Sequence, residues 1–281
     1  MKRIARIVCI SICCLSFPVL AISQDFKGTS GKAPIIEAPA RSFTVGENLN
    51  YSVQWLGIPV GNIVLSIEGM KKIRGSLCYN ISATVYPNSF FQHFYDLKYK
   101  VNTYVDSRSF HPLRFEKTRC LNGKENKVVI EFDRKDNQAC FVSEGDAGVV
   151  ALSLSRDELE KENPRTNKIS EDTQDLLSAF YYFRTLYIAA DKDYPLHIYY
   201  DQRNWPLQMK TGKPFYREAR KKRAIPMIKV NPVSQLNDYI LGRRDFVVYF
   251  STEASRIPIE FSLSTAVGPV RGIIQDLPSQ D

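Results

Sequence analysis

The chain has 281 residues, of which 44% are hydrophobic and 24% charged, and its formal net charge is +8. This length can bury the core of one large domain or two small ones without disulfide support. The mild positive charge makes an anionic surface a candidate partner, and the absence of HExxH, GxSxG, GxGxxG and Walker patterns excludes the commonest motif-based enzyme classes.

The first residues, "MKRIARIVCISICCLSFPVLAIS", have the three parts of a secretory signal. Three basic residues come first, and the apolar run Ile7 to Leu20 is shorter than the ~20 residues that span a bilayer. Small residues in "AIS" before Gln24 suit a signal peptidase. We therefore expect 1–23 to be a cleaved signal peptide and the mature protein to be periplasmic, with a retained membrane anchor as the alternative.

The mature chain keeps Cys78, Cys120 and Cys140, an odd number for an oxidising compartment. Cys120 ends one predicted strand and Cys140 opens the next strand but one. In a plain meander they would lie beyond the ~7 Å Cα separation that a disulfide allows. Unpaired cysteines on strands and a single disulfide involving Cys78 both stay open. No CxxC or Cys/His cluster indicates a metal or another cofactor.

After a flexible leader at 24–41, we expect a single β-rich domain over 42–277. In "GENLNYSVQW" the apolar Leu49, Tyr51, Val53 and Trp55 alternate with polar residues. The alternation resumes after an expected turn, "GIPVGN", and again in "LCYNISATVY" and "LKYKVNTYV". A period of two predicts antiparallel strands with one buried (dry) face and one solvent-exposed (wet) face.

Further strand patterns follow to the end of the chain. "LRFEKTRC" and "KVVIEFD" flank the Asn122-Gly123 turn signal, and "DFVVYF", "RIPIEFSLS" and "PVRGIIQ" close the sequence. With ~10 or more strands and no βαβ alternation, the predicted fold is mainly β. It would be a single strongly curved antiparallel sheet, an open barrel or spiral β-roll wrapped around one α-helix. Residues 144–170 lack the pattern and predict a surface loop with one helical turn.

The stretch "EDTQDLLSAFYYFRTLYIAA" predicts the one long helix, at about 172–190. Leu176, Phe180, Phe183 and Tyr187 recur at steps of four, three and four, which places them on one stripe, and Leu177 and Tyr181 widen it. We expect this stripe to face the sheet and Asp172 or Thr173 to cap the amino end. The helix would fill the mouth or trough of the curved sheet.

Three polar residues of this helix, Asp175, Ser178 and Arg184, are candidates either for chemistry or for anchoring. Asp175 and Arg184 point to opposite sides and lie ~13 Å apart along the axis, so they cannot share a site. Asp175 and Ser178 can meet, but the pair lacks a base. We therefore predict that all three anchor the helix and assign no catalytic residue.

The histidines and the basic segment give weaker signals. His93, His111 and His197 lie on separate segments, so the sequence predicts neither a metal site nor a catalytic pair. Residues 210–224 form the densest basic segment, interpreted either as a solvated turn or as a contact for anionic lipid headgroups or other envelope polyanions. Its candidate surface residues are Arg217, Arg220, Lys221, Lys222 and Arg223.

Four stretches resemble the domain of unknown function 3108 family of exported bacterial proteins: "VGENLNYSVQWLGIPVGNIVLSIEG" (45–69), "PLRFEKT" (112–118), "DTQDLLSAFYYFR" (172–184) and "STEASRIPIEFSLSTAVGPV" (251–270). They occur in the family's order, and the basic segment fits the family pattern least well. The resemblance implies an envelope protein of rolled β architecture, similar in outline to periplasmic lipoprotein carriers. The family has no established catalytic residues to carry over.

Together these observations predict a non-enzymatic binding or structural protein of the periplasm, holding a lipid, acyl chain or peptide. Candidate ligand contacts are the aromatics of the dry face and helix: Tyr51, Trp55, Tyr79, Tyr99, Phe180 and Phe183. A hydrophobic ligand, an envelope protein or an anionic membrane surface are the candidate partners, and nucleic acid is not expected. The alternative is an enzyme acting on an envelope polymer such as peptidoglycan, which a His–carboxylate or two-carboxylate cluster near 144–170 would favour.

Overall fold

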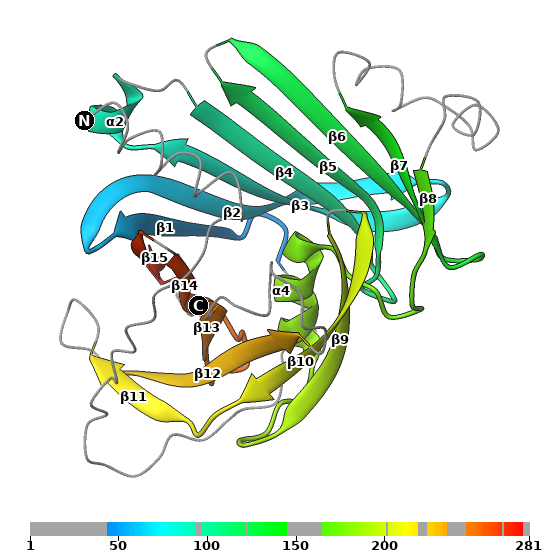
Figure 1. Ribbon diagram of the computed structural model, residues 1–281. Helices are drawn as coiled ribbons and strands as arrows, with labels where there is room; N and C mark the ends of the chain where they lie inside the picture. The colour runs from blue at the N-terminus through cyan, green and yellow to red at the C-terminus, as the bar shows by residue number, and fades with distance from the viewer. Residues whose placement is uncertain are drawn as a thin grey trace.

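The computed structural model describes residues 44–93, 97–121, 123–144, 165–200, 202–218, 224–234, 246–265 and 267–277. The predicted signal peptide and leader lie outside these ranges. Within them the chain forms fifteen strands and two helices (Figure 1). The strands are β1 Asn48–Trp55, β2 Ile58–Ile73, β3 Ser76–Pro87, β4 Leu97–Asp106, β5 Pro112–Leu121, β6 Lys124–Asp133, β7 Gln138–Glu144, β8 Arg165–Lys168, β9 Asp193–Tyr200, β10 Arg203–Thr211, β11 Phe215–Glu218, β12 Ala224–Ser234, β13 Phe246–Ser251, β14 Pro258–Thr265 and β15 Gly268–Ile274; the helices are α2 Ser89–Gln92 and α4 Leu176–Thr185.

All strands belong to one antiparallel sheet, which confirms the mainly β prediction. The order is β8-β7-β6-β5-β4-β3-β2-β1-β15-β14-β13-β12-β10-β9, and β11 pairs with β12 beside this path. The first and last strands are neighbours, with Tyr51 opposite Ile274. The edge strands β8 and β9 form no ladder with each other, so the sheet is not closed.

A connector between β8 and α4 bridges these two edges at single points. The N–H of Gln174 donates to the His197 carbonyl and the N–H of Tyr199 donates to the Gln174 carbonyl, both at 2.8 Å. The Asn167 amide donates to the Tyr199 hydroxyl at 2.9 Å. The prediction of a loop over 144–170 was wrong for residues 165–168, which form β8. The strand was missed because its four residues are polar and show no hydrophobic alternation.

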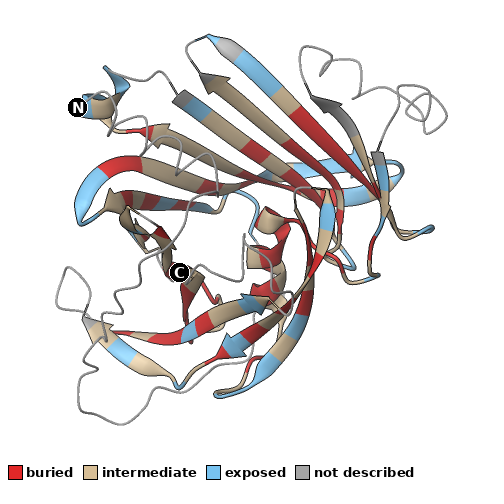
Figure 2. Cartoon of the chain, viewed as in Figure 1, coloured by how far each residue is buried: buried red, intermediate tan, exposed pale blue. Residues whose placement is uncertain are grey.

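Helix α4 lies beside β3 and β4 on one side and β9 on the other, as Figure 1 shows. Two core clusters meet at it. Leu177 and Tyr181 pack in the cluster built mainly from β1 to β7, whereas Ala179 and Phe183 pack in the cluster of β9, β10, β12 and β13. Figure 2 shows the helix largely in the colour of buried residues.

The predicted limits and face of the helix need correction. α4 covers Leu176–Thr185, and its N-cap is Asp175 rather than Asp172 or Thr173. The chain turns to extended backbone at Leu186, so Tyr187 never joins the helical stripe and is 69% exposed. Because cores lie on two sides of α4, its buried residues cover more than one stripe.

Three further expectations differ from the structure. A second helix, the four-residue α2, is present, and β2 begins at Ile58, so most of "GIPVGN" is strand. The wet face of β3 is also buried, since Cys78, Asn80 and Ser82 are at most 4% exposed. Polar side chains tolerate this burial through cross-strand hydrogen bonds, such as Asn80 to Glu68 at 2.9 Å.

Candidate functional site

The amino end of α4 is held by Asp175. Its Oδ1 accepts hydrogen bonds from the N–H groups of Leu177 and Ser178 at 2.8 and 2.9 Å, and Ser178 Oγ accepts from the Asp175 N–H at 2.9 Å. The hydroxyl of Thr103 on β4 donates to the other carboxylate oxygen at 2.5 Å. Burial raises the pKa of Asp175, and these hydrogen bonds oppose the rise. The carboxylate therefore caps the helix and fastens it to the sheet.

The connector before α4 is held by Arg134 from the β6–β7 turn. Its guanidinium donates to the carbonyls of Pro112 and Thr173, both at 2.8 Å, and lies 5.0 Å from the Phe132 ring centre. Burial lowers the pKa of Arg134 to about 10, while Asp175 and Asp172 oppose this change. The turn is thereby joined to the start of the helix.

The carboxyl end of α4 is held by Arg184. Its two terminal nitrogens donate to the two carboxylate oxygens of Glu47, each at 2.7 Å, and its Nε donates to the Ser255 carbonyl at 3.1 Å. The guanidinium also lies 5.1 Å from the Tyr181 ring centre. A paired, two-point interaction of this kind is strong when it is buried. It joins the helix end to the residue preceding β1 and to the loop preceding β14.

A second polar group surrounds Asp172. Its Oδ1 lies 2.8 Å from Nδ1 of His197, and the His111 ring centre lies 6.3 Å from that of Tyr182. Burial, and then the charge of Asp172, raises the pKa of Tyr182. Burial, and then the charge of Arg134, lowers the pKa of His111, which Asp172 opposes. Asp172 thus contacts His197 and acts electrostatically on His111, a relation between two distant segments that the sequence did not indicate.

Four of the six aromatic candidates lie at one core cluster, with Tyr51 inside it and Tyr79, Tyr99 and Phe180 packed against it, whereas Phe183 and Trp55 belong to other clusters. Tyr51 and Phe183 are at most 1% exposed, and the Tyr51 hydroxyl donates to the Pro258 carbonyl at 2.6 Å. The other four are partly buried. Tyr79, stacked on Phe110, Tyr99 and Phe180, beside Phe246, pack against the same cluster as Tyr51, and Trp55 packs beside Val53. Ligand contact by these residues stays a prediction, and it suits the four with accessible surface better than the two sealed ones.

The basic segment contains one described candidate, Arg217, which forms an ion pair with Glu260. Glu260 is 1% exposed, so Arg217 neutralises a buried carboxylate instead of extending into solvent. The other candidates, Arg220, Lys221, Lys222 and Arg223, lie outside the described residues.

The three cysteines of the domain are free thiols. Cys120 on β5 and Cys140 on β7 are separated by β6, as the meander predicted. Burial raises the pKa of Cys78 to about 11. Among the described residues, no group of three His, Cys, Asp or Glu side chains is arranged to hold a metal ion.

The sequence did not indicate the partners of the α4 anchors. Glu47, Thr103 and Arg134 come from three different strands or turns, and no local pattern links them to the helix. The only available signal was the polarity of α4 itself, because buried charged residues in a helix require opposite charges or hydrogen-bond partners.

Comparison with known proteins identifies the family. The model for "Protein of unknown function (DUF3108)" matches residues 50–275, so the chain belongs to this family. The fold is similar to the crystal structure of a beta-barrel-like protein of domain of unknown function DUF1849 from Brucella abortus, with a TM-score of 0.51 and 12% identity over 84% of this chain and 98% of that chain. No curated protein matches the sequence. None of the described helices has the length and apolar character needed to cross a membrane.

Proposed function

We propose that the protein is an exported, non-enzymatic binding or structural protein of the cell envelope, in which the antiparallel sheet curls around α4. The observation that carries this proposal is the use made of Asp175, Ser178 and Arg184. Each is buried and bonded to the sheet, to the helix backbone or to a paired carboxylate. The most conspicuous polar residues of the chain therefore act in architecture and are not available for catalysis.

In this proposal the partly buried aromatics hold a lipid, an acyl chain or a peptide. Trp55, Tyr79 and Tyr99 are the strongest candidates, since all three keep accessible surface and none lies on α4. Aromatic side chains offer large apolar contact areas, and most small-molecule sites are lined by such residues. Export rests on the signal pattern of residues 1–23.

Native mass spectrometry and solvent extraction of the protein purified from its exported form test this proposal. We expect a reproducible hydrophobic species in the wild type and less of it in Trp55→Ala and Tyr99→Ala. Tyr187→Ala is the matched control, because Tyr187 is exposed on the chain that leaves α4. Absence of any bound species from the wild type, or equal recovery from all variants, would contradict cargo binding.

The His197–Asp172 pair favours a second candidate, an enzyme acting on an envelope polymer. A carboxylate bound to imidazole Nδ1 orients the ring and supports its action as a base at the other nitrogen. Release of soluble fragments from purified peptidoglycan by the wild type, lost in His197→Gln, would support this candidate. No release by the folded wild type would count against it.

A further inference from the structure

The turn between β1 and β2 has a residue that its backbone disfavours. Leu56 and Gly57 have φ angles of +50° and +83°, and Trp55 pairs with Ile58 across them. These values define a type I′ turn, where Asn, Asp or Gly normally takes the first position. A leucine with positive φ is uncommon, and the side chain of Leu56 is also 56% exposed. The backbone conformation of the turn disfavours leucine, and the exposed side chain is not part of the core, so neither explains why Leu56 is present.

Two other segments place apolar side chains beside this turn. Asn88, which caps α2, donates from its side chain to the Pro59 carbonyl at 2.7 Å and from its backbone to the Val60 carbonyl at 3.1 Å. Helix α2 is thereby fixed to the start of β2, with Phe91 packed beside Val60 and Phe90 61% exposed.

The β14–β15 turn supports the same region. The Leu56 N–H donates to the Pro269 carbonyl at 3.2 Å, and the Trp55 indole donates to the Val267 carbonyl at 2.9 Å. A Cβ atom on Gly268 would lie 2.4 Å from a methyl group of Leu56, so the glycine makes room for this side chain.

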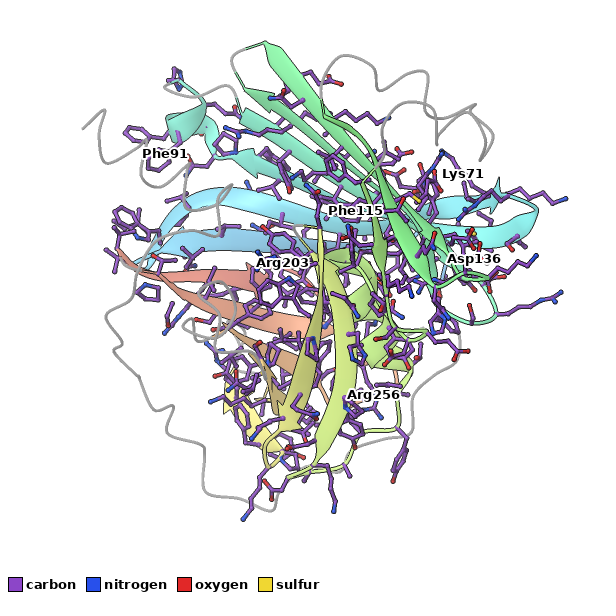
Figure 3. All side chains as sticks on the ribbon, turned by 45° about the vertical axis from the view of Figure 1, so that its right-hand side comes forward. Lys71, Phe91, Phe115, Asp136, Arg203 and Arg256 are labelled. Carbon is purple, nitrogen blue, oxygen red and sulfur yellow. The ribbon has the colours of Figure 1, made fainter. Side chains whose placement is uncertain are left out.

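Leu56, Ile58 and Phe90, which are 56, 58 and 61% exposed, are called the apolar tip below. Figure 2 shows exposed colour at the β1–β2 turn and on α2. In Figure 3, Phe91 of α2 lies at the opposite end of the molecule from Lys71 and Asp136. The apolar tip therefore occupies one end of the sheet, away from the charged turns.

The charges around the apolar tip have a consistent pattern. Residues 48–67, 75–95 and 261–270 contain no Asp, Glu, Lys or Arg. Lys98, near the start of β4, is exposed, and Arg271 lies opposite Gln54, one residue from Trp55. The acids farther along these strands, Glu68 and Glu260, are paired with Lys100 and Arg217. An uncharged apolar end is thus bordered by Lys98 and Arg271, while Glu68 and Glu260 are neutralised; the exposed Glu125 lies farther out, across Cys120 from Lys98.

We propose that the apolar tip inserts into the surface of an anionic phospholipid bilayer. Leucine, isoleucine and phenylalanine would enter the boundary between headgroups and acyl chains, where surface-bound proteins bury apolar residues. Trp55, with its indole N–H already bonded, would lie at headgroup level, and Lys98 and Arg271 would face the anionic headgroups. This docking site is separate from the basic segment 210–224, and the apolar tip itself contains none of the proposed cargo contacts, although Trp55 beside it is one of them.

Vesicle flotation with the mature protein tests the proposal directly. We expect binding to vesicles of phosphatidylcholine with phosphatidylglycerol, weaker binding to phosphatidylcholine alone, and release by salt because the headgroup attraction is screened. The chain has two tryptophans, and Trp205 is 1% exposed. A blue shift of tryptophan emission on binding would therefore report on Trp55, and Trp55→Phe should remove it.

The decisive variant combines Leu56→Asn, Ile58→Thr and Phe90→Ser. It should weaken vesicle binding ~100-fold, because three partly exposed apolar side chains no longer enter the bilayer. Leu77→Asn is the matched control. Leu77 is 53% exposed, but it lies at the start of β3, beside the β2–β3 turn and at the opposite end of the strand from α2. The control should bind as the wild type does.

Unchanged binding by the triple variant, or no binding by the wild type, would overturn the proposal. If the wild type instead self-associates in analytical ultracentrifugation and the triple variant does not, the occupant is a second copy of the chain and the membrane proposal fails. Cargo recovery is measured without vesicles, so failure of this inference is distinguishable from failure of the proposed function.

Discussion

The two ends of β2 have the same backbone and opposite chemistry. Leu56-Gly57 precedes the strand with φ angles of +50° and +83°, and Arg74-Gly75 follows it with +45° and +87°. Arg74 donates to the carbonyls of Leu113 and Phe132 at 3.1 and 2.6 Å and approaches Glu131 at 3.6 Å. Leu56 is mostly exposed and contacts Gly268.

This difference shows why an unfavourable turn residue must be judged by what its side chain does. At the Arg74 end, the side chain ties the β2–β3 turn to β5 and β6, so hydrogen bonds offset the strain. At the Leu56 end, no comparable contact with the described residues offsets it, which directs attention to an external partner. The Arg74 end is expected to contribute to the stability of the fold, and the Leu56 end is expected to contribute to binding of a partner.

The largest expected loss of stability follows Arg184→Ala. It would leave Glu47 partly buried without its charged partner, and breaking a buried pair by removing one member costs about 3–5 kcal/mol. Chemical denaturation would measure the change in free energy of unfolding. Arg184→Lys is the control, because it keeps the charge but loses the two-point geometry, and it should lose less stability. A wild-type unfolding curve for Arg184→Ala would contradict the anchoring role.

Asp175→Ala should lower the free energy of unfolding by about 2 kcal/mol, through loss of the helix cap and of the Thr103 bond. Asp175→Asn should lose less, since asparagine is also a good N-cap. The decisive comparison is between the two variants at one pH by denaturant titration. Equal losses of stability in the two variants would show that capping by the side-chain oxygen does not account for the contribution of Asp175.

The same residue predicts a pH dependence. Burial raises the folded-state pKa of Asp175, so the native state takes up its proton at a higher pH than the unfolded state. The contribution of Asp175 to stability is therefore greatest below its unfolded pKa and is lost as the pH rises through its folded pKa. Relative to Asp175→Asn, the wild type should gain stability as the pH falls through this window, and a parallel pH profile would contradict the raised pKa.

Arg74→Asn should lower stability by about 1 kcal/mol, although asparagine suits the turn better. The lost hydrogen bonds to Leu113 and Phe132 outweigh the gain in turn conformation, and the partial exposure of Arg74 limits the effect. Thermal unfolding would detect the change. A rise in melting temperature would show that the hydrogen bonds of Arg74 to Leu113 and Phe132 do not stabilise the fold.

Leu56→Asn is the opposite case and the smallest effect. Asparagine favours positive φ, so stability should rise by about 0.5 kcal/mol while vesicle binding falls about five- to tenfold. Measuring both quantities on one variant separates a structural from a binding role. A fall in stability without a change in vesicle binding would assign Leu56 to packing.

The strand pattern could be predicted from the sequence because alternation is local. Leu49, Tyr51 and Val53 alternate with polar residues, and all three are buried. The end of α4 could not be predicted in the same way, since residues 185–190 still read as apolar helix while the chain already leaves it at Leu186. The buried wet face of β3 also escaped prediction, because Asn80 and Ser82 are polar and their hydrogen-bond partners come from another strand.

The sequence by itself determined the antiparallel strands, the presence of helix α4 and the uncharged stretches, because each depends on residues close together in the chain. Only the tertiary structure decided that Arg184 pairs with Glu47, that Asp172 lies beside His197, and that Phe90 lies at the same end of the sheet as the β1–β2 turn. These contacts join residues far apart in sequence, and their partners are set by sheet order and register, which local patterns do not encode.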